Sequence, residues 1–258
     1  MDSSAPVDPV PSSSRRAWPF DLDIKSQEPI EQRWLRRIGQ TEIFVKESPA
    51  PARTTDDQAS TQIVTNLPIV QEDAATGAVA KSYSDYREHF GRPDVPGILK
   101  CFATHPPLLE QMIALASSLL FIEGHLPRRV KEMIATYVSA LNDCPYCLDS
   151  HASFLRTQGG SDELLSALSN GSLESPSIST KERQLLSFAR KVTNESYKVT
   201  ADDIRQLNDV GWDQLQIAEA THITALFAFF NRVVNTFGLP SQHRLDLDLA
   251  PTNSKENR

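Results

Sequence analysis

Two cysteines with a histidine four residues further on are the residues best suited to chemistry in this chain. Cys144 and Cys147 enclose Pro145 and Tyr146, and His151 follows one helical turn after the second cysteine. Residues three apart in a helix are neighbours, so the two sulfurs can close a small disulfide with little backbone movement. The pattern predicts a dithiol that is reversibly oxidised.

The expected local structure favours reactive thiols. Pro145 is well placed at a first helical position, so a helix is expected to begin at Cys144 with both cysteines in its first turn. Unpaired N–H groups at a helix start stabilise a thiolate. His151 lies on the same helical face as Cys147 and can exchange a proton with it. Glu132, on the preceding helix, can reach His151 if the two helices pack antiparallel, which predicts a proton relay.

Two other interpretations of the motif stay open at this level. Cys144, Cys147 and His151 could ligate zinc, with Glu132 or His125 as a fourth ligand, although structural zinc sites commonly have two CxxC-like knuckles and this chain has one. The Cys-Pro-Tyr-Cys tetrapeptide also occurs in glutaredoxins, whose fold needs strands around it. We predict neither a metal nor an organic cofactor.

The remaining cysteine and histidines carry weaker signals. Cys101 is expected to be a buried small hydrophobe and His222 a core histidine on an apolar helix. We expect His105 to lie in a turn and His243 in a tail. No phosphate-binding glycine loop, GxSxG elbow or HExxH motif occurs in the sequence.

Composition limits the class of protein. The 258 residues are 40% hydrophobic and carry a net charge of −7, which argues against a nucleic-acid partner. Three cysteines favour a reducing compartment, and the start of the chain does not read as a signal peptide. The most apolar stretch, residues 223–230, is too short to span a bilayer. We expect a cytoplasmic protein with no membrane partner.

From about residue 70 the apolar residues recur with helical periodicity, and almost no segment has the pattern of a strand. The fold class predicted is therefore all-α, a helical bundle. Start signals, apolar stripes and glycine stops predict helices over the following segments. They are Asp73 to Phe90, Pro107 to about Gly124, Val130 to Leu141, Cys144 to Gly159, a helix after Asp162, Thr180 to about Asn194, Thr200 to Val210, and Asp213 to Phe237.

Composition also divides the chain. Residues 1–60 are rich in Ser and Pro and are expected to form an extended or partly disordered arm, residues 65–240 a helical domain, and residues 241–258 a tail. A weak internal repeat relates an active half, about residues 106–170, to a degenerate half, about residues 180–240. Glu182 takes the place of Glu132 in the second half, which lacks the Cys and His.

The joint spacing Glu132-x11-Cys144-x2-Cys147-x3-His151 resembles the alkyl hydroperoxidase D-like group of the carboxymuconolactone decarboxylase superfamily. The resemblance covers about residues 65–240, includes Asn231, and is closest to the two-repeat, peroxidase-related members. It implies an all-helical fold, a homo-oligomer (dimer, trimer or hexamer) and peroxide reduction. By resemblance, Cys147 is the peroxidatic thiolate, Cys144 the resolving thiol, and His151 with Glu132 the relay.

The function predicted is a thiol-dependent peroxidase that reduces organic hydroperoxides through a dithiol/disulfide cycle. The family implies a lipoyl-type or thioredoxin-like dithiol as the reductant. One departure is Tyr146, where characterised relatives of this type place a His between the cysteines. The alternatives are a thiol-disulfide oxidoreductase or redox sensor acting on protein partners, or a decarboxylase-type enzyme on the same fold.

Overall fold

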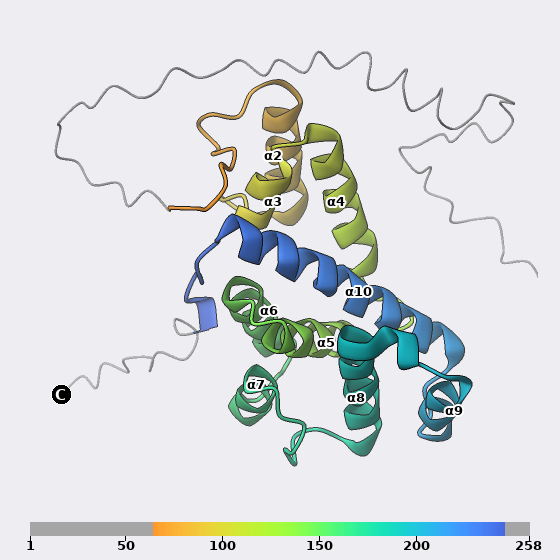
Figure 1. The fold of residues 1–258 in the computed structure, drawn as a ribbon. Coiled ribbons are helices and arrows are strands. Elements are labelled where there is room, and N and C mark those ends of the chain that lie inside the picture. Colours follow the sequence, from red (N-terminus) through yellow and green to blue (C-terminus); the bar gives the residue numbers. More distant parts are fainter. Residues whose placement is uncertain (1–63, 246–258) are drawn as a thin grey trace, which may run out of the picture. The chain divides into compact units, whose positions relative to one another are not determined.

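The computed structural model describes residues 64–245, which form helices and no strand (Figure 1). The all-α prediction is therefore confirmed, whereas the expected arm over residues 1–60 and the end of the tail lie outside the described residues. In chain order the elements are α2 (Gly77–Phe90), α3 (Gly97–Phe102), α4 (Pro106–Leu119), α5 (Arg128–Leu141), α6 (Pro145–Thr157), α7 (Asp162–Ser169), α8 (Thr180–Glu195), the 3-10 turn η2 (Ser196–Lys198), α9 (Ala201–Asp209) and α10 (Gln214–Phe237).

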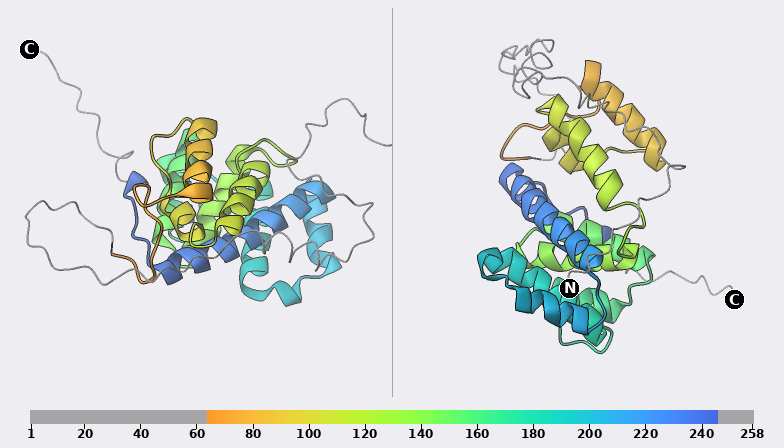
Figure 2. Two further views of the ribbon diagram at one scale, coloured as in Figure 1. Left: turned by 90° about the horizontal axis from the view of Figure 1, so that it is seen from above. Right: turned by 90° about the vertical axis from the view of Figure 1, so that its right-hand side faces the viewer.

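The long helix α10 lies between two groups of helices (Figures 1 and 2). Helices α2, α3 and α4 form one group, and their apolar side chains pack against Leu226 and Phe230 of α10. Helices α5 to α9 form the larger core on the other side, where α5 contacts α6, α7, α8 and α10. A third, smaller apolar cluster joins α3, α6 and α10 and contains all three cysteines. None of the helices in residues 64–245 has the length and apolar character needed to cross a membrane.

Helix α5 is buried on every side. Its apolar stripe predicts one core-facing side, but α6, α8 and α10 surround it, so residues 130–139 are all buried. Two charged residues of α5, Lys131 and Glu132, therefore lie in the interior with no exposed surface. Each has a partner of opposite charge, as a buried charge requires.

Lys131 and Glu219 form an ion pair that links α5 to α10. The Lys131 ammonium lies 2.7 Å from Glu219 Oε1 and donates to the Leu119 carbonyl at 2.8 Å. Glu219 Oε2 accepts a hydrogen bond from the Leu126 backbone N–H at 2.6 Å. A Cβ at Gly124 would lie 2.2 Å from Glu219 Oε1, so the loop between α4 and α5 needs glycine there. The pair holds this loop to α10.

Replacing Lys131 with Met should lower the free energy of unfolding by about 3–5 kcal/mol, because the buried Glu219 carboxylate loses its cation. Denaturant unfolding followed by circular dichroism measures the effect. The matched control is Lys81→Met, whose partner Asp85 is exposed along with it (side chains 75% and 60% exposed), so little change is expected. Equal, small losses in both variants would contradict a stabilising role for the buried pair.

Two elements of the first group differ from the predicted ones. Helix α2 begins at Gly77 rather than after Asp73, and residues 72–74 form a turn. The turn is held by Glu72, whose carboxylate accepts from Arg87 at 2.7 Å and from the Val95 N–H at 3.1 Å. Helix α3 was not predicted, because it is only six residues long and lies just after Pro96. Its buried face, which includes Leu99, comes from tertiary packing.

The start of the predicted tail is part of the folded domain. The Asp149 carboxylate on α6 accepts hydrogen bonds from the backbone N–H groups of Gln242 at 3.0 Å and Leu245 at 2.7 Å. These bonds hold residues 241–245, the C-terminal segment, against α6. The expectation of a tail from residue 241 is therefore wrong for this segment.

Candidate active site

Both cysteines of the motif are buried at the start of α6. Pro145 occupies the first helical position, as predicted, and Cys144 is the residue immediately before the helix. The turn from α5 is tight: Asp143 has a positive φ of 48°, and the Cys144 N–H donates to the Ser139 carbonyl at 3.0 Å. Cys144 is 1% exposed and Cys147 3% exposed, and both are free thiols.

Glu132 and His151 meet between α5 and α6, as their spacing predicts. The distance from His151 Nδ1 to Glu132 Oε2 is 2.7 Å, and the other carboxylate oxygen accepts from the Arg128 guanidinium. An ionised carboxylate can only accept, so Nδ1 carries the hydrogen and Nε2 of the neutral imidazole is the basic nitrogen. The rings of Phe154 and Phe227 pack edge-on against the imidazole, with centroids 5.4 and 4.6 Å away. The geometry fixes the tautomer that a proton acceptor needs.

Arg128 supports the buried carboxylate. Its guanidinium donates to the Leu120 carbonyl at 2.7 Å and lies over the Phe121 ring, 5.0 Å from the centroid. The side chain is thus held in place by contacts on two sides. Its positive charge compensates the negative charge of Glu132 in the interior.

The contact between the two sulfurs moves the pKa values of the two thiols in opposite directions. A hydrogen bond with Cys147 lowers the pKa of Cys144, and the same contact, together with burial, raises the pKa of Cys147 well above its usual value. The first thiolate therefore forms at Cys144, whereas the resemblance assigns the attacking thiolate to Cys147. The hydrogen bond between the sulfurs is a path by which the Cys147 proton can move to Cys144 and the charge to Cys147.

Asn231 on α10 contacts both sulfurs, a role that sequence spacing did not indicate. It is completely buried and hydrogen-bonds both cysteines, which favours their thiolates. Its Nδ2 also donates to Ser139 Oγ at 3.1 Å, and its Oδ1 accepts from Asn142 at 2.9 Å. These bonds orient the amide, so Asn231 is a positioning residue for the dithiol.

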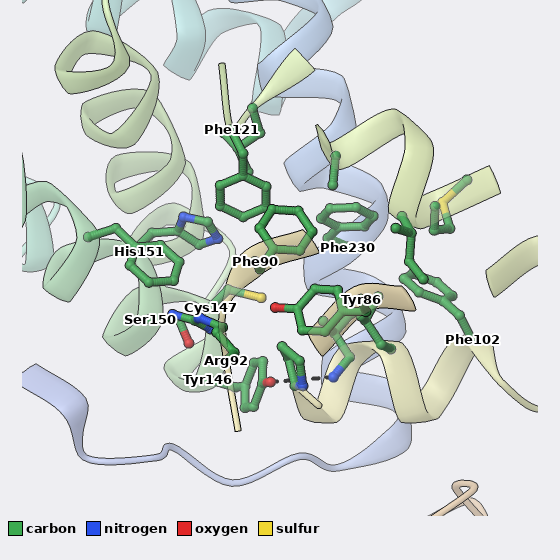
Figure 3. Close-up of a pocket in the computed structure, with 18 of the residues that line it drawn as sticks. Tyr86, Phe90, Arg92, Phe102, Phe121, Tyr146, Cys147, Ser150, His151 and Phe230 are labelled. Atoms are coloured by element: carbon green, nitrogen blue, oxygen red, sulfur yellow. Dashed lines mark hydrogen bonds between the residues drawn. The ribbon is translucent and has the colours of Figure 1, made fainter. Parts of the chain in front are cut away.

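A cavity of about 90 Å³ lies beside the dithiol (Figure 3). Cys147, Ser150 and His151 of α6 line it, and Cys144 does not. The facing walls come from α2, α3, α4, α10 and the C-terminal segment. They are mainly aromatic and aliphatic, and include Tyr86, Phe90, Phe102, Phe121 and Phe230. A ligand in this cavity meets one of the two sulfurs, that of Cys147.

Tyr146 has a structural position in the cavity wall. Its hydroxyl accepts from the Ile98 N–H and from Gln242 Nε2, both at 3.3 Å, and so joins α3, α6 and the C-terminal segment. Burial raises the pKa of the phenol far above its usual value. Tyr146 is therefore a neutral hydrogen-bonding group and does not supply the base that a histidine would.

The remaining candidates lie away from this chemistry. His105, His125 and His222 are exposed, so the expectation of a core histidine at position 222 is wrong. Cys101 is buried, as predicted, and burial raises the pKa of its thiol to about 12. Across residues 64–245 no three His, Cys, Asp or Glu side chains gather closely enough to hold a metal ion. The zinc interpretation of the motif thus has no geometric support.

Comparison with known proteins gives a consistent family. Residues 106–170 match the model of the Carboxymuconolactone decarboxylase family. A 101-residue segment is 34% identical to an alkyl hydroperoxide reductase of Mycobacterium tuberculosis, covering 39% of this chain and 28% of that relative. The match therefore spans less than a third of that relative's length.

Solved structures extend the similarity over the helical domain. An uncharacterized peroxidase-related protein from Ralstonia eutropha JMP134, described as an alkylhydroperoxidase core, is 25% identical with a TM-score of 0.65, over 72% of this chain and 96% of that one. The debrominase Bmp8 shares the fold alone, at 18% identity and a TM-score of 0.57 over 74% of this chain and 98% of that one. Residues 106–170 thus match the Carboxymuconolactone decarboxylase family, and the helical domain is similar in fold to alkylhydroperoxidase-like proteins.

Proposed function

We propose that the protein is a thiol-dependent peroxidase that reduces organic hydroperoxides. The observation that carries the proposal is that Cys147 and His151 line one apolar cavity while Glu132 holds the imidazole at 2.7 Å. A reactive sulfur, a proton carrier and a binding space for an organic molecule thus occur together. The similarity to an alkyl hydroperoxide reductase supports the same chemistry.

The first step breaks the O–O bond of the substrate. The Cys147 thiolate attacks the outer oxygen of the hydroperoxide, forming an S–O bond and expelling an alkoxide. His151, which has taken up the proton of the dithiol, returns it to the alkoxide and releases an alcohol. Glu132 stabilises the imidazolium while it carries that proton. Cys147 is left as a sulfenic acid.

The second step forms the disulfide. The Cys144 sulfur attacks the sulfenic sulfur of Cys147, the S–O bond breaks, and water leaves with the Cys144 proton. The two thiols hydrogen-bond in the reduced state, so little movement is needed to bring the sulfurs together. Over both steps, two electrons from the dithiol reduce one hydroperoxide to an alcohol and water.

A dithiol donor must then restore the two thiols, and the burial of the site favours a slender one. Cys147 is 3% exposed, and in the reduced structure its sulfur borders the cavity. A lipoyl-type arm can enter such a space, whereas the flat active surface of a thioredoxin-like protein requires an exposed disulfide. The same burial disfavours the alternative in which the dithiol acts on disulfides of protein partners.

We expect dihydrolipoamide to sustain hydroperoxide consumption and thioredoxin with its reductase to support none above background. The dihydrolipoamide reaction is followed as consumption of cumene or tert-butyl hydroperoxide in a ferrous oxidation assay. The thioredoxin reaction is followed as NADPH oxidation. Reduction of insulin disulfides should also stay at background. Rapid insulin reduction without hydroperoxide consumption would instead identify a thiol-disulfide oxidoreductase.

A further inference from the structure

The charged side chains that line the cavity are all basic. They are Arg92 and Arg244, and no Asp or Glu contributes to its walls. The whole chain has the opposite balance, with 33 acidic and 26 basic residues excluding histidine. A cavity that is apolar and basic in an acidic protein favours a ligand with an apolar body and a negative charge.

Arg92 presents a guanidinium without a carboxylate partner in residues 64–245. It follows α2 in the chain, and its guanidinium lies over the Phe154 ring, 5.2 Å from the centroid. It also hydrogen-bonds the Tyr86 hydroxyl. Stacking on Phe154 and bonding to Tyr86 hold the side chain at the cavity, and the remaining N–H groups of the planar fork suit a carboxylate.

Arg244, near the other end of the domain, places a second guanidinium in the cavity wall. It belongs to the C-terminal segment that Asp149 holds against α6, and it donates through Nε to Gln242. Its contact with Asp94 is long, 3.6 Å, and the Asp94 side chain is 55% exposed. Arg92, Asp94 and Arg244 all act electrostatically on the Tyr86 hydroxyl, and both arginines line the cavity with Tyr86.

We propose that the preferred substrates are organic hydroperoxides that carry a carboxylate, which Arg92 and Arg244 bind. This inference rests on the proposed peroxidase function and adds the chemical class of its substrate. The apolar body lies among the aromatic walls, with the hydroperoxide at Cys147 and the carboxylate at the half-buried arginines. A cavity of about 90 Å³ is smaller than the cavity of about 150 Å³ that binds benzene, so the apolar body that it encloses must be small.

Pairs of hydroperoxides that differ only in having a free carboxylate or its methyl ester test the proposed role of the carboxylate. We expect 3-hydroperoxy-3-methylbutanoate, or a homologue with up to three more methylenes, to be reduced with a kcat/KM roughly 10-fold or more above that of its methyl ester. Arg92→Met and Arg244→Met should each bring the ratio of kcat/KM for the acid to that for its ester close to one. Arg205→Met is the control, because Arg205 pairs with Asp202 on exposed α9 and does not line the cavity. Equal rates for every acid and ester pair would overturn the proposal.

A second measurement does not depend on peroxidase activity. The unreactive 3,3-dimethylbutanoate should slow alkylation of Cys147 by iodoacetamide, whereas its methyl ester should protect less, as measured by peptide mass spectrometry. The two arginine variants should lose the difference. Selective protection without any hydroperoxide reduction would leave the carboxylate site standing and refute the peroxidase. Reduction of esters and acids alike, with no selective protection, would refute the carboxylate site alone.

Discussion

Replacing Cys147 by serine should reduce hydroperoxide consumption to the uncatalysed background. A serine hydroxyl at this position is not ionised near neutral pH and cannot form the sulfenic acid, so the first step is lost. The measurement is consumption of a hydroperoxide with dihydrolipoamide as donor. Unfolding of the variant should be close to wild type, because the serine side chain is only slightly smaller and keeps a hydrogen-bonding atom near Cys144.

Cys144→Ser is the matched variant that separates the two roles. Without a donor it should consume one hydroperoxide per chain and then stop, with dimedone trapping a sulfenic acid at Cys147. Cys101→Ser should keep full turnover, since this thiol does not line the cavity. Dimedone at Cys144 in the Cys147→Ser variant, with turnover retained, would mean that the sulfur with the lowered pKa is the attacking one. Hydroperoxide consumption that survives loss of both cysteines would rule out the dithiol mechanism.

Replacing Glu132 by glutamine should lower kcat/KM for hydroperoxide roughly 100-fold or more, because the imidazolium of His151 loses its negative partner. Pairing Glu132→Gln with His151→Gln in a double-mutant cycle should give losses far from additive, as expected for residues that act as one unit.

The control for this variant comes from the other half of the domain. Glu182 also accepts from an arginine, Arg129, but has no histidine beside it. Glu182→Gln should lose some stability, because the carboxylate also caps α8 at Ser179, and should keep its activity. If Glu132→Gln lost stability but kept the wild-type kcat/KM, Glu132 would be a purely structural residue.

Local signals predicted most of the helices and the relay. Pro145 fixes the start of α6, and the spacing of Glu132 and His151 places them on facing sides of two helices joined by a tight turn. These features depend on a few neighbouring residues, so the sequence alone reveals them. Helix α3 depends instead on burial of Leu99 against α2 and α4, which no local pattern records.

The cavity could not be predicted either, because it too depends on tertiary packing and not on a local sequence pattern. Tyr86 and Arg92 come from the start of the domain and Arg244 from its end, and no periodicity relates the two segments. At His222 a local pattern predicted burial that the structure does not have. Its neighbours Ile223 and Thr224 are buried, yet one step along a helix turns a side chain by about 100°, and His222 faces solvent.

The hydrogen bonds between Asp149 and the C-terminal segment bear on how the substrate selectivity can be changed. Asp149 accepts from backbone N–H groups, which every residue except proline provides. The side chain of Arg244 can therefore vary while these backbone bonds to α6 are kept, whereas the Gln242 side chain also bonds Tyr146. Randomising position 244 is a route to new selectivities that leaves the helices bearing the dithiol and the relay unchanged, so selectivity and reactivity can be engineered, or can diverge in evolution, as separate traits.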